Sequence, residues 1–516
     1  MTGQKQQAAR RLFDAITAAD DRWVAQAAAH APAAQKKPAV RWPRRAALAA
    51  CAALVVGIGG AALRLGGSGG GAGCAGENGT FQAYAGPVLP LTVQGDAEGL
   101  TTARTIHYDF APYTPRQEQT AGANGETRVY ERYETCALVT DRYTLTNTSD
   151  TEKNVTALYP FVGDLFDAAD RAAVTVKGAA VEGMLRPGPC SADAGASLDS
   201  WQGYRTLLAD GSYQAAALAE YPAPDVPVTV YRFTDFAADH TADPAVTLAV
   251  DVTIDPQTAV VLTYGFNGLS VQEDGCRRYS FFVPEPGSAA AAQARYLIVV
   301  GTDLSACTMQ GYADGGCNPG EERQASARME RYETTLADVL AETLALYEQD
   351  LAGAHGGEMQ ALCGALQLET RLSLAAAMLY AHGPLARQES RRWDLPMLED
   401  VYAETYGGTR LFYLAVPVTV PARGSAEITV YLTQDASYDY HTNNARQGGA
   451  HGYDFVTQAG TALNFTDLTV SVDTRGQVEI LDQNLGLDPE NGTAEAVLDP
   501  AQERYYLVVR RVGQTG

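Results

Sequence analysis

Motifs for the common enzyme chemistries are missing from this sequence. No C-x-x-C pair occurs among its 516 residues, so a structural zinc site of the usual thiolate spacing is not expected. There is also no P-loop, no H-E-x-x-H helix, no EF-hand ladder, and no G-x-S-x-G elbow between a predicted strand and helix. We therefore predict no catalytic residues, no cofactor and no metal site.

Basic residues are also scarce. The chain has 38 Lys and Arg against 61 Asp and Glu, which gives a net charge of −23. Positive charge gathers before residue 46, so residues 65–516 carry a net charge of about −30, which repels polyanions. We expect no nucleic-acid partner, and we interpret most of this charge as a solvated acidic surface.

Long apolar runs are missing except for one. Residues 46–63, AALAACAALVVGIGGAAL, contain no charge. A helix of this length measures roughly 27 Å, which is close to the ~30 Å hydrocarbon core of a bilayer. The sequence therefore predicts a transmembrane helix over residues 46–64, in contact with the lipid bilayer through residues 46–63.

The flanks of this run predict its orientation. Its N-terminal side carries basic residues and one interfacial aromatic residue: Lys36, Lys37, Arg41, Trp42, Arg44 and Arg45. Its C-terminal side has only Arg64, before a Gly-rich linker at 65–85. Because Lys and Arg are retained on the cytoplasmic side, we predict a single-pass cell-membrane protein with a cytoplasmic N-terminus and an outer C-terminal region. A cleaved signal peptide is less favoured because about 45 residues precede the run, and a lipoprotein site is less favoured because Cys51 lies near the start of the run. The basic and Gly-rich flanks disfavour a buried helix of a soluble domain.

Residues 1–45 are predicted to form a short amphipathic helix and a Pro-containing tether. Leu12, Ile16 and Trp23 recur at roughly helical spacing. Two interpretations stay open: a solvated juxtamembrane helix, and a segment that docks into a groove of a cytoplasmic regulator.

The N-terminal region also carries a resemblance. The segment LFDAITAADDRWVAQA, with the Lys/Arg/Pro tether and the Ala-rich apolar run, resembles uncharacterised single-pass envelope proteins of Gram-positive bacteria. Some of these are grouped with membrane-bound anti-sigma factors, but this chain lacks a His/Cys cluster before residue 46. The segments YAGPVLPLT and FYLAVPVTVPARGS resemble companions of that group. The resemblance implies an envelope protein, with signalling as an alternative.

The fold class expected beyond the linker is mainly β. Residues 86–303 contain short strands separated by polar turns, which predicts an antiparallel β-sandwich-like region. We predict hairpins between 139–146 and 155–162 and between 246–254 and 259–264, and a turn at Lys177-Gly178.

Apolar spacing predicts a helical insert over residues 304–408. A first helix is expected from Met329 to Leu351, ended by glycines from Gly353 onward, and two more follow. Residues 409–516 are expected to form a second β-sandwich-like region that begins with a hairpin over 411–432. The stretch 438–454, which contains two histidines, is interpreted as an exposed polar loop.

Cysteine usage suggests one local disulfide. Seven cysteines follow the apolar run, and an oxidising exterior would allow them to pair. Cys307 and Cys317 flank a short Gly-rich loop and are the candidate pair.

Together these observations favour a membrane-tethered extracytoplasmic protein that binds a ligand or another envelope component, or has a structural role. A transmembrane signalling protein with a cytoplasmic docking helix is the alternative, and an enzyme of unrecognised type comes last.

Overall fold

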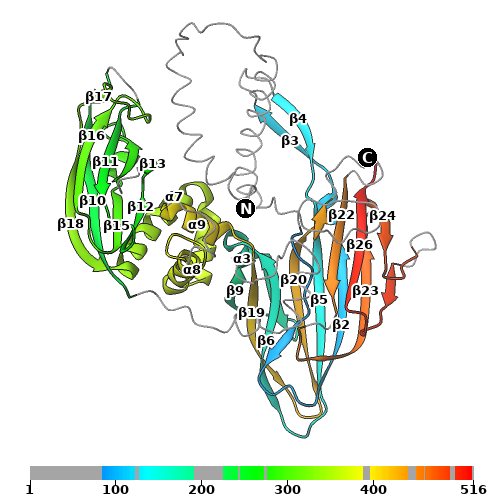
Figure 1. The fold of residues 1–516 in the computed structure, drawn as a ribbon. Coiled ribbons are helices and arrows are strands. Elements are labelled where there is room, and N and C mark those ends of the chain that lie inside the picture. Colours follow the sequence, from blue (N-terminus) through cyan, green and yellow to red (C-terminus); the bar gives the residue numbers. More distant parts are fainter. Residues whose placement is uncertain are drawn as a thin grey trace. The chain divides into compact units, whose positions relative to one another are not determined.

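The computed structural model describes residues 84–121, 127–190, 225–241, 245–271, 276–386, 396–439, 449–457, 460–488 and 494–513. They form mainly antiparallel β-structure, as predicted (Figure 1). The predicted docking helix, tether, transmembrane helix and its flanking residues lie outside these ranges. Of the helices that the structure describes, none is both long and apolar enough to cross a bilayer.

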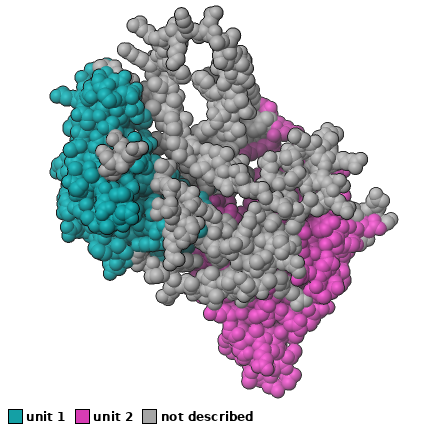
Figure 2. Space-filling model, in the orientation of Figure 1, with its two compact units in different colours: residues 1–66, 221–406 teal, residues 67–220, 407–516 magenta. Residues whose placement is uncertain are grey.

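The chain divides into two compact units (Figure 2). Unit 1 contains residues 221–406, grouped with 1–66, and unit 2 contains residues 67–220 and 407–516. In sequence, unit 1 is therefore inserted into unit 2. The predicted β region 86–303 is split between the units, and the helices of the predicted insert share unit 1 with the strands that precede them.

Unit 1 is built on two antiparallel sheets. The first has the strand order β12 (Ala259–Tyr264), β15 (Arg295–Gly301), β10 (Pro227–Ala238) and β18 (Ala325–Thr335). The second has the order β13 (Gly268–Val271), β14 (Cys276–Phe282), β11 (Thr247–Thr253), β16 (Ala306–Tyr312) and β17 (Glu322–Arg323). A single helical turn, α6 (Ala289–Ala292), precedes β15.

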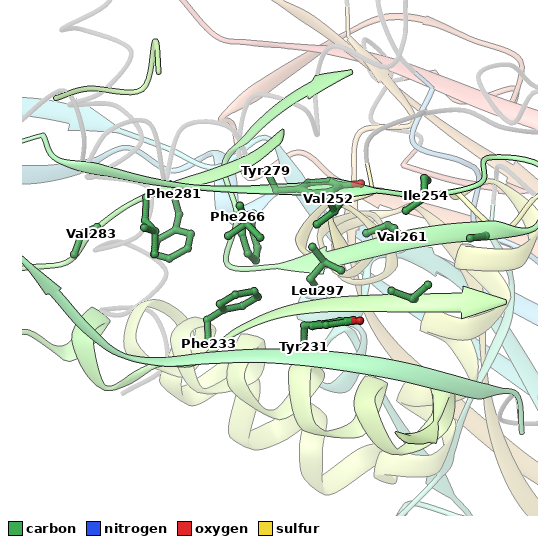
Figure 3. Close-up of a cluster of buried hydrophobic side chains, with 14 of the residues drawn as sticks. Tyr231, Phe233, Val252, Ile254, Val261, Phe266, Tyr279, Phe281, Val283 and Leu297 are labelled. Carbon is green, nitrogen blue, oxygen red and sulfur yellow. The ribbon is translucent and has the colours of Figure 1, made fainter. Parts of the chain in front are cut away.

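The two sheets enclose an aromatic and aliphatic core (Figure 3). Phe233 comes from the first sheet and Phe281 from the second, and Phe266 lies between them in edge-to-face contact with both rings. Each fully buried side chain of this size contributes roughly 1.5–3 kcal/mol, so this interface is the main apolar core of unit 1.

Three helices follow the first sheet: α7 (Leu336–Ala365), α8 (Leu368–Ala381) and α9 (Leu398–Gly407). α7 and α9 contact the other face of this sheet, and α8 packs on α7. Tyr296 on β15 donates a 2.6 Å hydrogen bond to Glu342 on α7, and the rings of Tyr264 and Tyr402 lie 6.5 Å apart. Strand alternation explains this layering, because Tyr264 and Tyr296 face away from the core residues of their own strands.

The predicted start and end of the first helix are wrong. Met329 lies on strand β18, which pairs with β10, and the helix begins only after Thr335, whose hydroxyl accepts a hydrogen bond from the Asp338 amide. The helix then continues through Gly353 and Gly356, at each of which an added Cβ would meet open space. A glycine weakens a helix by about 1 kcal/mol but does not end it, and the packed apolar face outweighs that cost.

Unit 2 contains three larger sheets. A seven-stranded sheet has the order β25 (Glu495–Val497), β23 (Asn464–Asp473), β2 (Leu100–Asp109), β5 (Cys136–Asn147), β20 (Ser425–Asp435), β7 (Ala172–Val176) and β8 (Ala179–Val181). One four-stranded sheet has the order β1 (Thr92–Gln94), β6 (Lys153–Gly163), β19 (Arg410–Val420) and β9 (Met184–Cys190). The other has the order β21 (Tyr438–Asp439), β22 (Ala450–Val456), β26 (Arg504–Arg511) and β24 (Val478–Gln483).

Smaller elements complete unit 2. They are the helix α3 (Leu165–Arg171), the 3-10 turn η1 (Ala111–Tyr113) and the two-stranded ribbon of β3 (Arg116–Ala121) and β4 (Thr127–Arg132). The predicted turn at Lys177-Gly178 is confirmed. It joins β7 to β8, and both turn residues have positive φ angles.

Three predicted hairpins have correct strands but wrong pairing. β5 pairs with β20 and β6 pairs with β19, so the segments 136–163 and 410–435 each pass from one sheet to another. The turns of these two segments bind each other: the Asn147 amide donates to Gly424 O and the Arg423 amide donates to Ser149 O. Likewise β11 and β12 belong to different sheets of unit 1. A turn sequence predicts a chain reversal, but the sheet that each strand joins depends on distant partners.

The predicted polar loop 438–454 is wrong in its last part, because residues 450–456 form the fully buried strand β22. Its polar groups are satisfied from far away in sequence. Asp454 accepts hydrogen bonds from Tyr84 at 2.6 Å and from Arg504 at 2.9 Å. Gly452 is needed because a Cβ there would lie 2.0 Å from the Tyr438 ring.

A buried ion pair lies where the three sheets of unit 2 meet. Arg104 on β2 binds Asp141 on β5 through two hydrogen bonds, of 3.0 and 2.7 Å, and neither side chain is exposed to solvent. Arg104 also donates to Val456 O on β22 at 2.6 Å. Asp141 accepts from Tyr143 at 2.6 Å and from Tyr159 on β6 at 3.3 Å.

We predict that R104M destabilises the protein by about 3–5 kcal/mol, because it leaves Asp141 buried without its cation. R142M is the matched control, since Arg142 is about half exposed and lies 4.0 Å from Glu427. Its substitution is expected to cost about 0–1 kcal/mol. Urea unfolding of the purified chain measures both, and equal losses in the two variants would contradict this role for the ion pair.

Candidate functional site

The predicted Cys307–Cys317 disulfide is not present, and both thiols are free. Cys307 pairs in register with Val252 and packs against the core between the sheets. Cys317 instead forms a buried cluster with Ala249 and Tyr312. Ala249 is one residue out of phase with Val250 and Val252, so the two cysteines lie on opposite faces of the same sheet. Closeness in sequence therefore did not bring their side chains together.

The most unusual polar group of unit 1 is the carboxylate at the start of α9. The backbone before α9 runs beside β12, where the Thr263 amide donates to Pro396 O at 2.8 Å. This places Glu399, in the first turn of α9, beside the end of β12, and its Oε1 accepts a hydrogen bond from the Gly265 amide. Gly265 has φ +82°, and a Cβ there would lie 2.0 Å from Arg295 Cδ.

Glu399 is held without a close ionic partner among the described residues. Its Oε2 is shielded from solvent and has no hydrogen-bond partner there, and the same is true of Arg295 Nε. Burial raises the pKa of Glu399 to about 7, although the Gly265 amide and the charge of Arg295 both favour the ionised form. Burial also lowers the pKa of Arg295. Glu399 is therefore a carboxyl group that exchanges its proton near neutral pH.

The surrounding helices are held together by satisfied polar groups. Arg371 on α8 binds Glu348 on α7 at 2.6 Å, and Tyr406 on α9 donates to the same carboxylate. Thr343 and Tyr402 share a 2.7 Å hydrogen bond between α7 and α9. These contacts hold α9, the helix that carries Glu399, against α7 and α8.

Chemically, this arrangement places one proton-exchanging carboxyl group beside a guanidinium and the phenol of Tyr264. Burial raises the pKa of this phenol, so it stays neutral. Within the described ranges, no three His, Cys, Asp or Glu side chains gather to hold a metal ion. Sequence reasoning missed Glu399 because its burial depends on Gly265 and Arg295, more than a hundred residues earlier.

Comparisons with known proteins found no match that bears on this site. No protein-family model matches the chain, and no curated protein matches it. The resemblance of the N-terminal region to envelope proteins therefore stays a prediction.

We predict that Glu399 makes stability fall as pH rises from about 4.5 to 7. In this window the unfolded chain has lost the Glu399 proton and the folded chain still holds it, so the folded state binds more protons. Comparing wild type with E399Q isolates this effect, and we expect the variant to lose roughly 2–4 kcal/mol less between pH 4 and pH 8.

The control for this prediction is E369Q, because Glu369 is exposed in the first turn of α8. Urea unfolding at each pH is the measurement. E369Q should keep the wild-type pH dependence, and an E399Q curve parallel to wild type would contradict the assignment.

Proposed function

We propose that this chain is a single-pass envelope protein whose outer β units bind a ligand or a neighbouring envelope component. The observation that carries the proposal is the asymmetry around residues 46–63: a basic flank precedes the apolar run, and a strongly acidic region follows it. Such asymmetry favours a cytoplasmic N-terminus and an external C-terminal region.

The architecture supports a binding or structural role. All described residues follow the apolar run in sequence. The described ion pairs in the interior, such as Arg104 with Asp141 and Arg371 with Glu348, join strands or helices of a single unit. Unit 2 carries unit 1 as an insertion, an arrangement by which a β scaffold acquires an additional module.

Labelling of introduced cysteines tests the topology. V497C is a suitable outer reporter because Val497 is 84 % exposed, and T2C reports on the N-terminus. In intact bacteria that express the full chain with C74S and C363S, a membrane-impermeant maleimide should label V497C. It should label T2C only after permeabilisation. The reverse pattern, or recovery of the full chain from the cytosol, would refute the proposal.

The signalling alternative rests on the stripe of Leu12, Ile16 and Trp23. If this stripe docks into a cytoplasmic regulator, L12A/W23A should reduce recovery of that regulator with the solubilised full chain at least tenfold. D14A/D21A is the matched control, because at 3.6 residues per turn these two acids lie on the opposite side of the predicted helix from the stripe. Equal recovery with all three chains would remove the support for this alternative.

A further inference from the structure

Sulfur atoms gather along one open side of the unit 1 sandwich. β16 and β18 are neighbouring strands from different sheets and run antiparallel to each other there. Gly311 on β16 lies against Ala325 on β18. Cys307, four residues before Gly311, has its Sγ 3.7 Å from Sδ of Met329, which lies four residues after Ala325. We call this contact region the sulfur seam.

A third sulfur belongs to the same seam. Met309 lies two residues from Cys307 on the same face of β16, and both pack against the edge of the core. The pairing of the strand ends places Met309 opposite Ala327, which is small and also packs against the core edge. One thiol and two thioethers therefore line a short stretch of this seam.

The sulfur seam is accessible from solvent. Met329 is 39 % exposed, and Cys307 and Met309 are partly buried. A methionine that only fills a core gap is enclosed by its neighbours, whereas Met329 presents its thioether at the surface.

We propose that Cys307, Met309 and Met329 form a binding site for a soft monovalent cation of the Cu(I) class. Thiolate and thioether ligands select Cu(I) over harder cations. Sulfur ligands lie about 2.3 Å from a metal ion such as zinc, so two on one ion are at most about 4.6 Å apart. The 3.7 Å contact meets this limit with little rearrangement.

Binding exchanges one proton for the cation. The S–H bond of Cys307 breaks, a sulfur–metal bond forms, and the proton passes to solvent, with no change in oxidation state. Without the cation, burial raises the pKa of Cys307 to about 11, so the thiol is protonated at neutral pH. This site does not depend on the proposed membrane topology.

Residue-resolved alkylation tests the site in the full chain. Cu(I) is supplied anaerobically at limiting concentration through a competing chelator, and each cysteine is assayed by mass spectrometry after N-ethylmaleimide treatment. Cu(I) should slow alkylation of Cys307 at least tenfold while the exposed Cys363 still reacts. M329L and M309L should each weaken this protection at least threefold, and M184L should leave it unchanged, because Met184 is exposed on β9 of unit 2.

Leucine conserves the volume of methionine, and circular dichroism confirms that each variant is folded. Equal protection of Cys307 in wild type, M309L and M329L would overturn the proposal, because the thiol would then bind alone. Protection of Cys363 before Cys307, or no protection of Cys307, would also overturn it.

Discussion

Unit 2 depends on the buried pair of Arg104 and Asp141. Removing two charges from water costs several kcal/mol for each ion, and only close, fully hydrogen-bonded geometry offsets that cost. Here the geometry requires β2 and β5 in register, the β22 carbonyl of Val456 against Arg104, and the β6 hydroxyl of Tyr159 against Asp141. Segments separated by some 350 residues must all be in place before the pair is satisfied. We infer that the pair selects the correct arrangement of sheets more than it adds net stability.

Unit 1 uses buried charge in two ways. Glu348 has both a guanidinium and a phenol as partners, so its position between three helices is fixed. Glu399 has a backbone amide on one oxygen and no described partner on the other. The difference between a satisfied and a half-satisfied carboxylate decides which one holds the fold and which one responds to pH.

Sequence patterns predicted the strands better than their partners. Short runs bounded by turn sequences identified residues 139–146, 155–162, 246–254 and 259–264 as strands, but the hairpins that sequence proximity suggested pass between sheets. The sequence did not predict strand β22, because its polar residues are typical of a loop. They fit a buried strand only because Tyr84 and Arg504, which are distant in sequence, bind Asp454. Arg104 could have been found, since it is in phase with Leu100, Ile106 and Tyr108 on a strand with one buried face. No comparable local signal exists for Glu399.

The cysteines and the charge asymmetry are two separate arguments for placing the β units outside the cell. Cys307 and Cys317 are ten residues apart, yet a sheet lies between their side chains, so the loop that they flank offers no evidence of an oxidising compartment. The argument for an external region rests instead on the charge asymmetry about residues 46–63, which is independent of disulfide formation. A free Cys307 is also the form that a soft cation requires, because a disulfide sulfur cannot provide a thiolate.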